Sequence, residues 1–215
     1  GSVVADVGSG TGILAALLLE RGATVFAVEP NAAMRAAAEA WLGDRPGFVS
    51  IDATAEATGL PDASVALITA GQAFHWFEPA ATQAEFRRIL RSSGPVALVW
   101  NSRDKRSAFV ADYEAMLDEY AHSYRRVRHD SHMHSIGQFF ADGYEMRVFD
   151  HERPQEYDSL LGGLLSGSYS PLPGDPRYEP MVARLQAIFA AHQRDGRVVT
   201  PYRTQVYFGR LRSVA

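Results

Sequence analysis

"VVADVGSGTG", residues 3–12, decides the fold. An apolar run over residues 3–7 leads directly into three glycines separated by single residues, and a helical pattern begins at Ile13. A buried strand followed by a glycine-rich turn and a helix is typical of sheets that bind a nucleotide-like ligand at the turn. The stretch therefore predicts the first strand and the first helix of an α/β domain, with a ligand site between them.

The alternation of strand and helix continues to residue 101. Gly22 is expected to end the first helix, and Asn31 is expected to cap the second. Right-handed crossovers between parallel strands then give a doubly wound sheet with helices on both faces. The expected strands are 3–7, 24–28, 48–52, 65–70 and 96–100, and the expected helices are 13–21, 31–42 and 79–90.

The pattern changes after Asn101. It predicts helices over 107–124, 136–141, 156–165 and 178–194, a half-exposed strand over 144–153 and an alternating last strand over 201–211. We expect one domain over 1–215, with a core over 1–101, a helical insertion over 102–142, and C-terminal strands with a second helical insertion over 143–215.

Composition excludes several classes of function. The 215 residues contain no cysteine, which removes disulfides, thiolate metal sites and cysteine nucleophiles. A net charge of −4 argues against nucleic acid as a partner. No apolar run approaches the ~20 residues of a membrane span. The absence of cysteine fits a cytoplasmic protein, and many arginines beside a single lysine, Lys105, suggest a bacterial coding bias.

The spacing of the glycines separates two classes of cofactor. Glu29 ends the second predicted strand, where a carboxylate accepts hydrogen bonds from ribose hydroxyls in either class. A dinucleotide turn reads G-x-G-x-x-G, but Ile13 stands where its third glycine belongs. Asp6 at the strand end would repel a pyrophosphate. It suits a ligand that carries a cationic amino group and a sulfonium.

The motifs resemble those of class I S-adenosylmethionine-dependent methyltransferases. "ADVGSGTG" (5–12) and "VEP" (28–30) are similar to the first two motifs, and "TAEATGLPDASVALITAGQAFHWF" (54–77) is similar to the third and fourth. The form is that of small-molecule, methyltransferase type 11-like enzymes. "LVWN" (98–101), "SGSYSPLPGDPRYEPM" (166–181) and "YRTQVYFGRL" (202–211) resemble a bacterial subgroup. The resemblance implies a Rossmann-like, mostly parallel seven-stranded sheet with an antiparallel last strand.

The resemblance also implies roles for individual residues. The glycine turn would approach the methionine part of S-adenosylmethionine, Asp6 its amino group, Glu29 the ribose, and Gln72 the region of the methyl group. Thr54 stands where the family usually has aspartate beside the adenine, so Asp52 or Glu56 could replace that contact. The cofactor-binding residues implied are Asp6, Gly8, Ser9, Gly10, Gly12, Glu29, Pro30, Met34, Thr54, Ala55 and Gln72.

His75 and Trp76 follow the predicted fourth strand, at the edge where such sheets bind ligands. His75 is either a general base or substrate ligand, or a packed side chain that orders the loop, with Trp76 and Phe77 in the core. Methyl transfer depends mostly on alignment, and a base is needed only where the acceptor carries a proton of unsuitable pKa. His75 is the candidate catalytic residue. Trp76, Tyr113 and Tyr169 are the candidate substrate-lining residues.

Other functions have less support from the residues. His129, His132 and His134 lack an ordered carboxylate or a fourth ligand, so no metal is expected. A nucleic-acid methyltransferase would need a cysteine nucleophile or an Asn/Asp-Pro-Pro-aromatic run, and neither is present. A non-catalytic module that binds S-adenosylmethionine stays open. The acceptor and the oligomeric state are not readable from the sequence.

The first strand stands at the start of the sequence. In the family that the chain resembles, a helix that covers one face of the sheet and a segment that closes over the cofactor precede this strand. We therefore expect an N-terminal helix or lid that is missing from these 215 residues.

Overall fold

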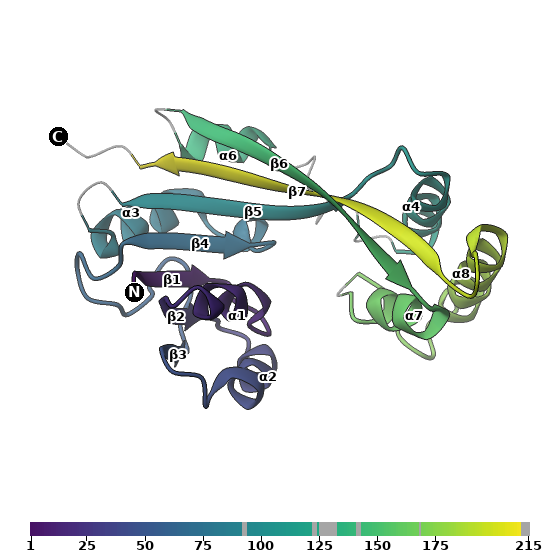
Figure 1. Ribbon diagram of the computed structural model, residues 1–215, viewed down its shortest axis with the longest axis horizontal. Helices are drawn as coiled ribbons and strands as arrows, with labels where there is room; N and C mark the ends of the chain where they lie inside the picture. The colour runs from purple at the N-terminus through teal and green to yellow at the C-terminus, as the bar shows by residue number, and fades with distance from the viewer. Residues whose placement is uncertain (92–93, 122–123, 125–132, 141–142, 168, 212–215) are drawn as a thin grey trace. The chain divides into compact units, whose positions relative to one another are not determined.

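The computed structural model describes residues 1–91, 94–121, 124, 133–140, 143–167 and 169–211. The described residues divide into two compact units: residues 1–100, 132–147 and 205–215 form the first, and residues 101–131 and 148–204 form the second. The elements of Figure 1 are β1 (Val3–Val7), α1 (Ile13–Glu20), β2 (Thr24–Val28), α2 (Ala32–Leu42), β3 (Phe48–Ile51), β4 (Leu67–Gly71), η1 (Phe74–Trp76), α3 (Pro79–Ile89), β5 (Pro95–Arg103), α4 (Ala108–Tyr120), α6 (Met133–Phe139), β6 (Tyr144–Gln155), α7 (Tyr157–Leu165), α8 (Tyr178–His192) and β7 (Val198–Arg210).

The strands form one mixed sheet. Its order is β3-β2-β1-β4-β5-β7-β6, and β1 pairs in parallel with β2 and β4. Strand β2 pairs in parallel with β3, and β4 with β5. Figure 1 shows β7 running against its neighbours. The expected seven-stranded, mostly parallel sheet with an antiparallel last strand is confirmed.

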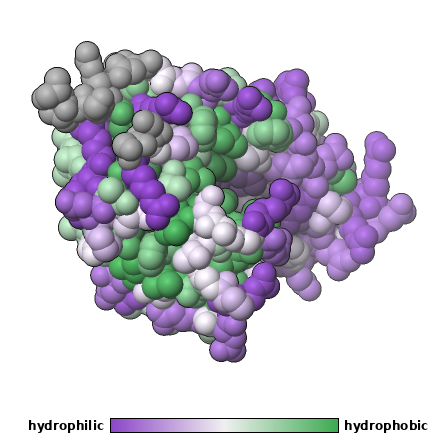
Figure 2. Space-filling model, turned by 60° about the vertical axis from the view of Figure 1, so that its left-hand side comes forward, coloured by the Kyte–Doolittle hydropathy of each residue, from purple (hydrophilic) through white to green (hydrophobic). Residues whose placement is uncertain are grey.

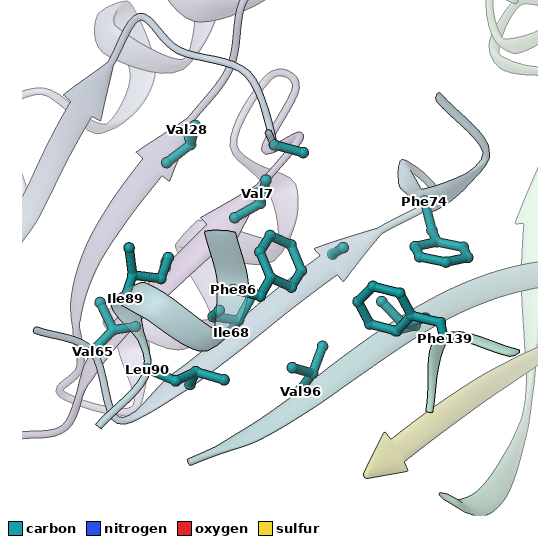
Figure 3. Close-up of a cluster of buried hydrophobic side chains, with 14 of the residues drawn as sticks. Val7, Val28, Val65, Ile68, Phe74, Phe86, Ile89, Leu90, Val96 and Phe139 are labelled. Atoms are coloured by element: carbon teal, nitrogen blue, oxygen red, sulfur yellow. The ribbon is translucent and has the colours of Figure 1, made fainter. Parts of the chain in front are cut away.

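Two apolar clusters hold the helices of the first unit to the sheet. One contains Ala5 and Val7 of β1, Phe86 and Ile89 of α3, and Phe139 of α6. Figure 3 shows the side chains of Val7, Phe86 and Phe139 within this cluster. The second cluster gathers buried residues of α1, β2 and α2, namely Ala15, Ala16, Leu19, Val25 and Leu42. Helices therefore cover both faces of the sheet, as the continuous apolar strands predict.

The helix ends follow local chemistry. Gly22 has φ +77° directly after α1, as expected for a C′ glycine. The side chain of Asn31 accepts hydrogen bonds from the N–H groups of Ala33 and Met34, so it caps α2 as predicted. Glu78 caps α3 in the same way, a role that the sequence analysis does not assign. These caps fix where each helix begins after the strand that precedes it.

The second unit has its own core. Helices α4, α7 and α8 contribute Phe109, Met116, Leu117, Leu160, Leu164, Met181, Leu185 and Ile188 to one cluster of buried side chains, to which Val198 of β7 also belongs. Because this core is distinct from the two clusters of the first unit, each unit carries the apolar interior that a compact body needs. The expectation of one domain over 1–215 stays a prediction.

Large apolar side chains also lie on the surface. Ile13 and Leu17 of α1 are 69% and 55% exposed. Figure 2 shows hydrophobic residues gathered over the middle of the face that it draws, with hydrophilic residues around them. Among the described residues, no helix has the length and apolar character to cross a membrane. The expectations of a preceding N-terminal segment and of a cytoplasmic location stay predictions.

Candidate functional site

The glycine turn lies where the strand order reverses. The chain passes from β1 to β2 and β3 on one side, and β4 and β5 lie on the other side of β1. Residues 8–12 follow β1, Glu29 follows β2, and Gln72 follows β4. Parallel strands end at the same edge of a sheet, so these three segments meet at one topological switch point. This is the position at which open α/β sheets bind ligands.

The turn is built from backbone bonds and left-handed glycines. The N–H groups of Gly8 and Ser9 donate to the carbonyl oxygen of Val28 at 2.8 and 3.1 Å. Gly8, Gly10 and Gly12 have φ of +68°, +57° and +89°, a region that favours glycine. The turn is therefore attached to the end of β2, beside Glu29.

The three glycines meet different surroundings. A Cβ on Gly8 would lie 2.4 Å from Cβ of Ala73, and one on Gly12 would lie 2.7 Å from Cδ1 of Leu42. A Cβ on Gly10 would meet only Sδ of Met34, at 4.0 Å. Packing inside the protein thus requires glycine at Gly8 and Gly12, whereas Gly10 faces open space. That open side is available to a ligand.

Glu29 is buried and held by two backbone donors. Its Oε2 accepts from the N–H of Gly10 at 2.9 Å, and its Oε1 accepts from the N–H of Asn31 at 2.9 Å. Each carboxylate oxygen can accept more than one hydrogen bond, so both oxygens keep capacity for an additional donor. The carboxylate is fixed against the turn before any ligand arrives.

Arg35 of α2 links the backbone of Glu29 to the side chain of Asp52. Its Nη1 donates to the carbonyl oxygen of Glu29 at 2.9 Å, and its two Nη atoms form a bidentate pair with Asp52 at 3.0 and 2.9 Å. Asp52, which the sequence offers as a possible adenine contact, is instead paired with Arg35. The spacing of Arg35 from Glu29 and Asp52 carries no motif that would have revealed this link.

Asp6 lies fully buried at the end of β1. Its Oδ1 accepts from the hydroxyl of Thr69, its partner residue on β4, at 2.8 Å, and its Oδ2 has no hydrogen-bond partner among the described residues. Burial raises the pKa of Asp6 to about 7, against the hydrogen bond from Thr69 and the amide of Ala15, and the charge of Glu29 adds to the rise. A cation placed here would favour the ionised carboxylate.

The residues expected around the adenine differ in their exposure to solvent. Pro30, Met34 and Thr54 are exposed, and Ala55 is buried in the core of the first unit. Glu56, the other replacement considered for the missing aspartate, accepts a hydrogen bond from the N–H of Glu78 at 2.9 Å. Met34 is the side chain nearest to the open side of Gly10, and its place beside the cofactor stays a prediction.

The segment after β4 turns sharply. Gln72 has φ +55°, an unusual value for a residue with a side chain, and its N–H donates to the carbonyl oxygen of Val99. His75 is half-buried in η1, with its ring 4.9 Å from the ring of Trp76. Trp76 is 69% exposed, so the alternative that it packs in the core is wrong. Phe77 packs against the core of the first unit.

The second unit holds a cavity of about 220 Å3. Tyr113 lines it, whereas Tyr169 packs edge-on against Tyr124 with ring centroids 4.9 Å apart. The walls also include Arg103, Arg153, Gln155 and Thr200, none of which the sequence analysis singles out. They come from β5, β6 and β7, three strands that are far apart in the sequence, so no local motif could have found the set.

The described residues contain no group of three or more His, Asp or Glu side chains placed to hold a metal ion. His129 and His132 lie outside the described residues, as does the side chain of His134. The expected absence of a metal therefore stays a prediction.

Comparison with known proteins finds a family model and several relatives that match part of the chain. Residues 5–98 match the family model described as "Methyltransferase domain". An uncharacterized methyltransferase of Mycobacterium tuberculosis strain H37Rv is 42% identical over 109 residues, which cover 51% of this chain and 44% of that protein. One from Geobacillus thermodenitrificans is 35% identical over 118 residues, 54% of each chain. The chain thus matches about half the length of these relatives.

Solved structures share the fold at low identity. A protein of Anaeromyxobacter dehalogenans, provisionally described as a type II methyltransferase, superposes with a TM-score of 0.68 at 23% identity, over 97% of this chain and 89% of that one. The geranyl diphosphate C-methyltransferase of Streptomyces coelicolor, solved with S-adenosyl-L-homocysteine, gives 0.50 at 15% identity over 99% and 70%. At these identities the likeness shows the fold alone.

Proposed function

We propose that the chain, whose residues 5–98 match the model of a methyltransferase domain, transfers the methyl group of S-adenosylmethionine to a small-molecule acceptor. The observation that carries the proposal is the set of groups prepared for that donor at the switch point. These are the buried carboxylate of Glu29, the open side of Gly10, and the buried Oδ2 of Asp6.

The residues present fit the donor group by group. Both oxygens of Glu29 keep acceptor capacity, which matches two ribose hydroxyls. The carboxylate of Asp6, whose Oδ2 has no hydrogen-bond partner among the described residues, suits an ammonium group at short range or through a water. Gly10 lets a ligand approach the backbone, and Met34 offers an apolar wall beside it. A pyrophosphate at the same place would face two carboxylates.

Bound S-adenosylmethionine supplies an activated methyl group: the acceptor forms a bond to the methyl carbon while the carbon–sulfur bond breaks and its electron pair stays on sulfur, leaving S-adenosylhomocysteine. The chain binds and aligns the reactants. We propose that His75 accepts the proton of an acceptor that carries one, and that Gln72 and Trp76 lie beside the reacting groups. We also propose that Pro30, Thr54 and Ala55 lie near the adenine.

Calorimetry with S-adenosylhomocysteine tests the donor site directly. Glu29→Gln should weaken binding about tenfold or more, because a hydrogen bond to a charged group contributes ~1.5–3 kcal/mol. Glu20→Gln, on an exposed position of α1, is the matched control and should leave binding unchanged. The unfolding midpoint of each variant without ligand checks that Glu29→Gln has not disrupted the glycine turn over residues 8–12. Failure of the wild-type chain to bind S-adenosylhomocysteine would refute the proposal.

One alternative stays open, a module that binds S-adenosylmethionine without catalysis. The exposed Trp76 and half-buried His75 beside the switch point favour an enzyme over this alternative, since a mere binding module has no need of them. Incubation with S-adenosylmethionine and a broad panel of small-molecule acceptors separates the two. Binding without formation of S-adenosylhomocysteine on any acceptor favours the module.

A further inference from the structure

The cavity of the second unit has walls of one charge sign. Arg103, at the end of β5, and Arg153, near the end of β6, both line it, and no carboxylate of the described part of the chain does. The wall also carries the side chains of Gln155 and Thr200, together with the apolar side chains of Phe109 and Leu160. A cavity with several donors, two cations and an apolar side is suited to an anion attached to an apolar body.

Arg103 is a fixed part of this wall. Its Nε donates to Oε1 of Glu114 at 2.8 Å, its Nη2 donates to the hydroxyl of Tyr124 at 2.8 Å, and its Cζ lies 4.9 Å from the ring centroid of Tyr113. These contacts hold the guanidinium in one orientation and use neither N–H of Nη1. Glu114 balances the charge of Arg103 from outside the cavity wall.

Arg153 is different, because its charge has no partner among the residues that the structure describes. Its side chain is exposed and forms no ion pair or hydrogen bond with the described residues. With Glu114 balancing Arg103, the lining keeps the uncompensated positive charge of Arg153. An anion is the ligand that this charge favours, and an exposed position lets the guanidinium meet it from solvent.

Gln155 adds an oriented neutral donor. The hydroxyl of Thr200 donates to Oε1 of Gln155 at 2.9 Å, and both side chains are buried. This bond orients the amide, whose two N–H groups can donate to an acceptor in the cavity. A carboxylate accepts such bonds through two oxygens, whereas a neutral ligand that needs acceptors from the protein finds few.

We propose that this cavity is a binding site for a small organic carboxylate with an apolar body. Arg153 and Gln155 bind the carboxylate, Arg103 provides a positive wall, and Phe109 and Leu160 receive the apolar part. A volume of about 220 Å3 lies below the ~300–1,000 Å3 of sites for drug-sized ligands, which limits the body to one ring or a short chain. The site goes beyond the proposed methyl transfer and requires no methyl donor to be bound.

Titration calorimetry on the whole chain without methyl donor tests the site, with benzoate and hexanoate as probes and benzamide as the neutral match for benzoate. We expect benzoate or hexanoate to bind and benzamide to bind at least about tenfold more weakly, since a hydrogen bond to a charged group contributes ~1.5–3 kcal/mol. No binding of either carboxylate, or equal binding of benzamide, would overturn the proposal. Tighter binding of inorganic phosphate than of both carboxylates would overturn the assignment to an organic carboxylate.

Variants locate the binding in the cavity. Arg153→Gln should weaken carboxylate binding about tenfold or more, while Arg184→Gln, an exposed position of α8 outside the cavity lining, should leave it unchanged. Gln155→Glu keeps the shape of the side chain, adds a negative charge and should abolish binding. Neither change touches the pair of Arg103 with Glu114, and the unfolding midpoint of each variant without ligand checks that the fold is kept. Unchanged binding in both Arg153→Gln and Gln155→Glu would show that the cavity is not the site.

Discussion

At the scale of a single residue, Asp6 is the most strongly perturbed group of the candidate donor site. Burial raises its pKa from 3.8 to about 7. At a pH between these two values, Asp6 is protonated in the folded chain and ionised in the unfolded chain. The free energy of unfolding therefore falls as pH rises from about 4 to about 7. Asp6→Asn removes this dependence. At pH 8 the ionised Asp6 lowers the free energy of unfolding of the wild type by at most about 4 kcal/mol, because one pKa unit corresponds to ~1.36 kcal/mol.

Urea unfolding at pH 5 and pH 8 measures this effect. The stability of Asp6→Asn relative to wild type should rise between the two pH values, and that of Asp44→Asn, an exposed control, should not. If the difference in the free energy of unfolding between wild type and Asp6→Asn is the same at pH 5 and at pH 8, the carboxylate of Asp6 is not desolvated. An amino group bound beside Asp6 favours its ionised form, so binding of S-adenosylhomocysteine should tighten as pH rises from 6 to 8.

The glycines of the turn should separate fold from function. Gly8→Ala places a methyl 2.4 Å from Cβ of Ala73 at φ +68°, and we expect it to destabilise the chain by about 2 kcal/mol or more. Gly10→Ala meets nothing closer than 4.0 Å and costs only the ~1 kcal/mol of its left-handed backbone. Gly10→Ala should nevertheless weaken the binding of S-adenosylhomocysteine. Thermal unfolding and calorimetry give the two readouts, and equal losses of stability in both variants would contradict the distinction.

At the scale of an element, η1 carries the proposed base. Replacing His75 by Gln keeps a polar side chain in this short helix but removes the proton acceptor. We expect kcat to fall about 100-fold or more with the acceptor that the wild type methylates, because general bases contribute ~100–10,000-fold. The affinity for S-adenosylhomocysteine should be unchanged. His192→Gln on α8 is the control, and an unaltered kcat in His75→Gln would remove the base from the mechanism.

Elements whose signals are local were predictable from the sequence. The first three strands, the cap at Asn31 and the order of the site segments around the switch point all follow from residues close together in the chain. Strand β5 extends to Arg103, beyond the predicted end at residue 100. Apolar patterning cannot find this extension, because Arg103 is half-buried and held by Glu114 and Tyr124, partners 11 and 21 residues away. The cavity has the same long-range origin.

At the scale of the whole molecule, the two units carry different reporters. All three tryptophans, Trp41, Trp76 and Trp100, lie in the first unit. Tryptophan fluorescence therefore follows the unfolding of the unit that contains the proposed donor site, whereas far-UV circular dichroism follows the helices of both. The pair of measurements tests whether residues 1–215 unfold as the single domain that the sequence analysis expects.

Saturating donor analogue makes that test quantitative. S-adenosylhomocysteine at 100 times its Kd should add about 2.7 kcal/mol to the free energy of unfolding of the unit that binds it. The fluorescence-monitored Tm should then rise by roughly 5–10 °C, on the ~2–4 °C per kcal/mol of a chain of this size. If circular dichroism shows one transition that moves equally, the units unfold together. A second transition that stays in place would divide the chain into two domains, and an unmoved fluorescence transition would contradict a donor site in the first unit.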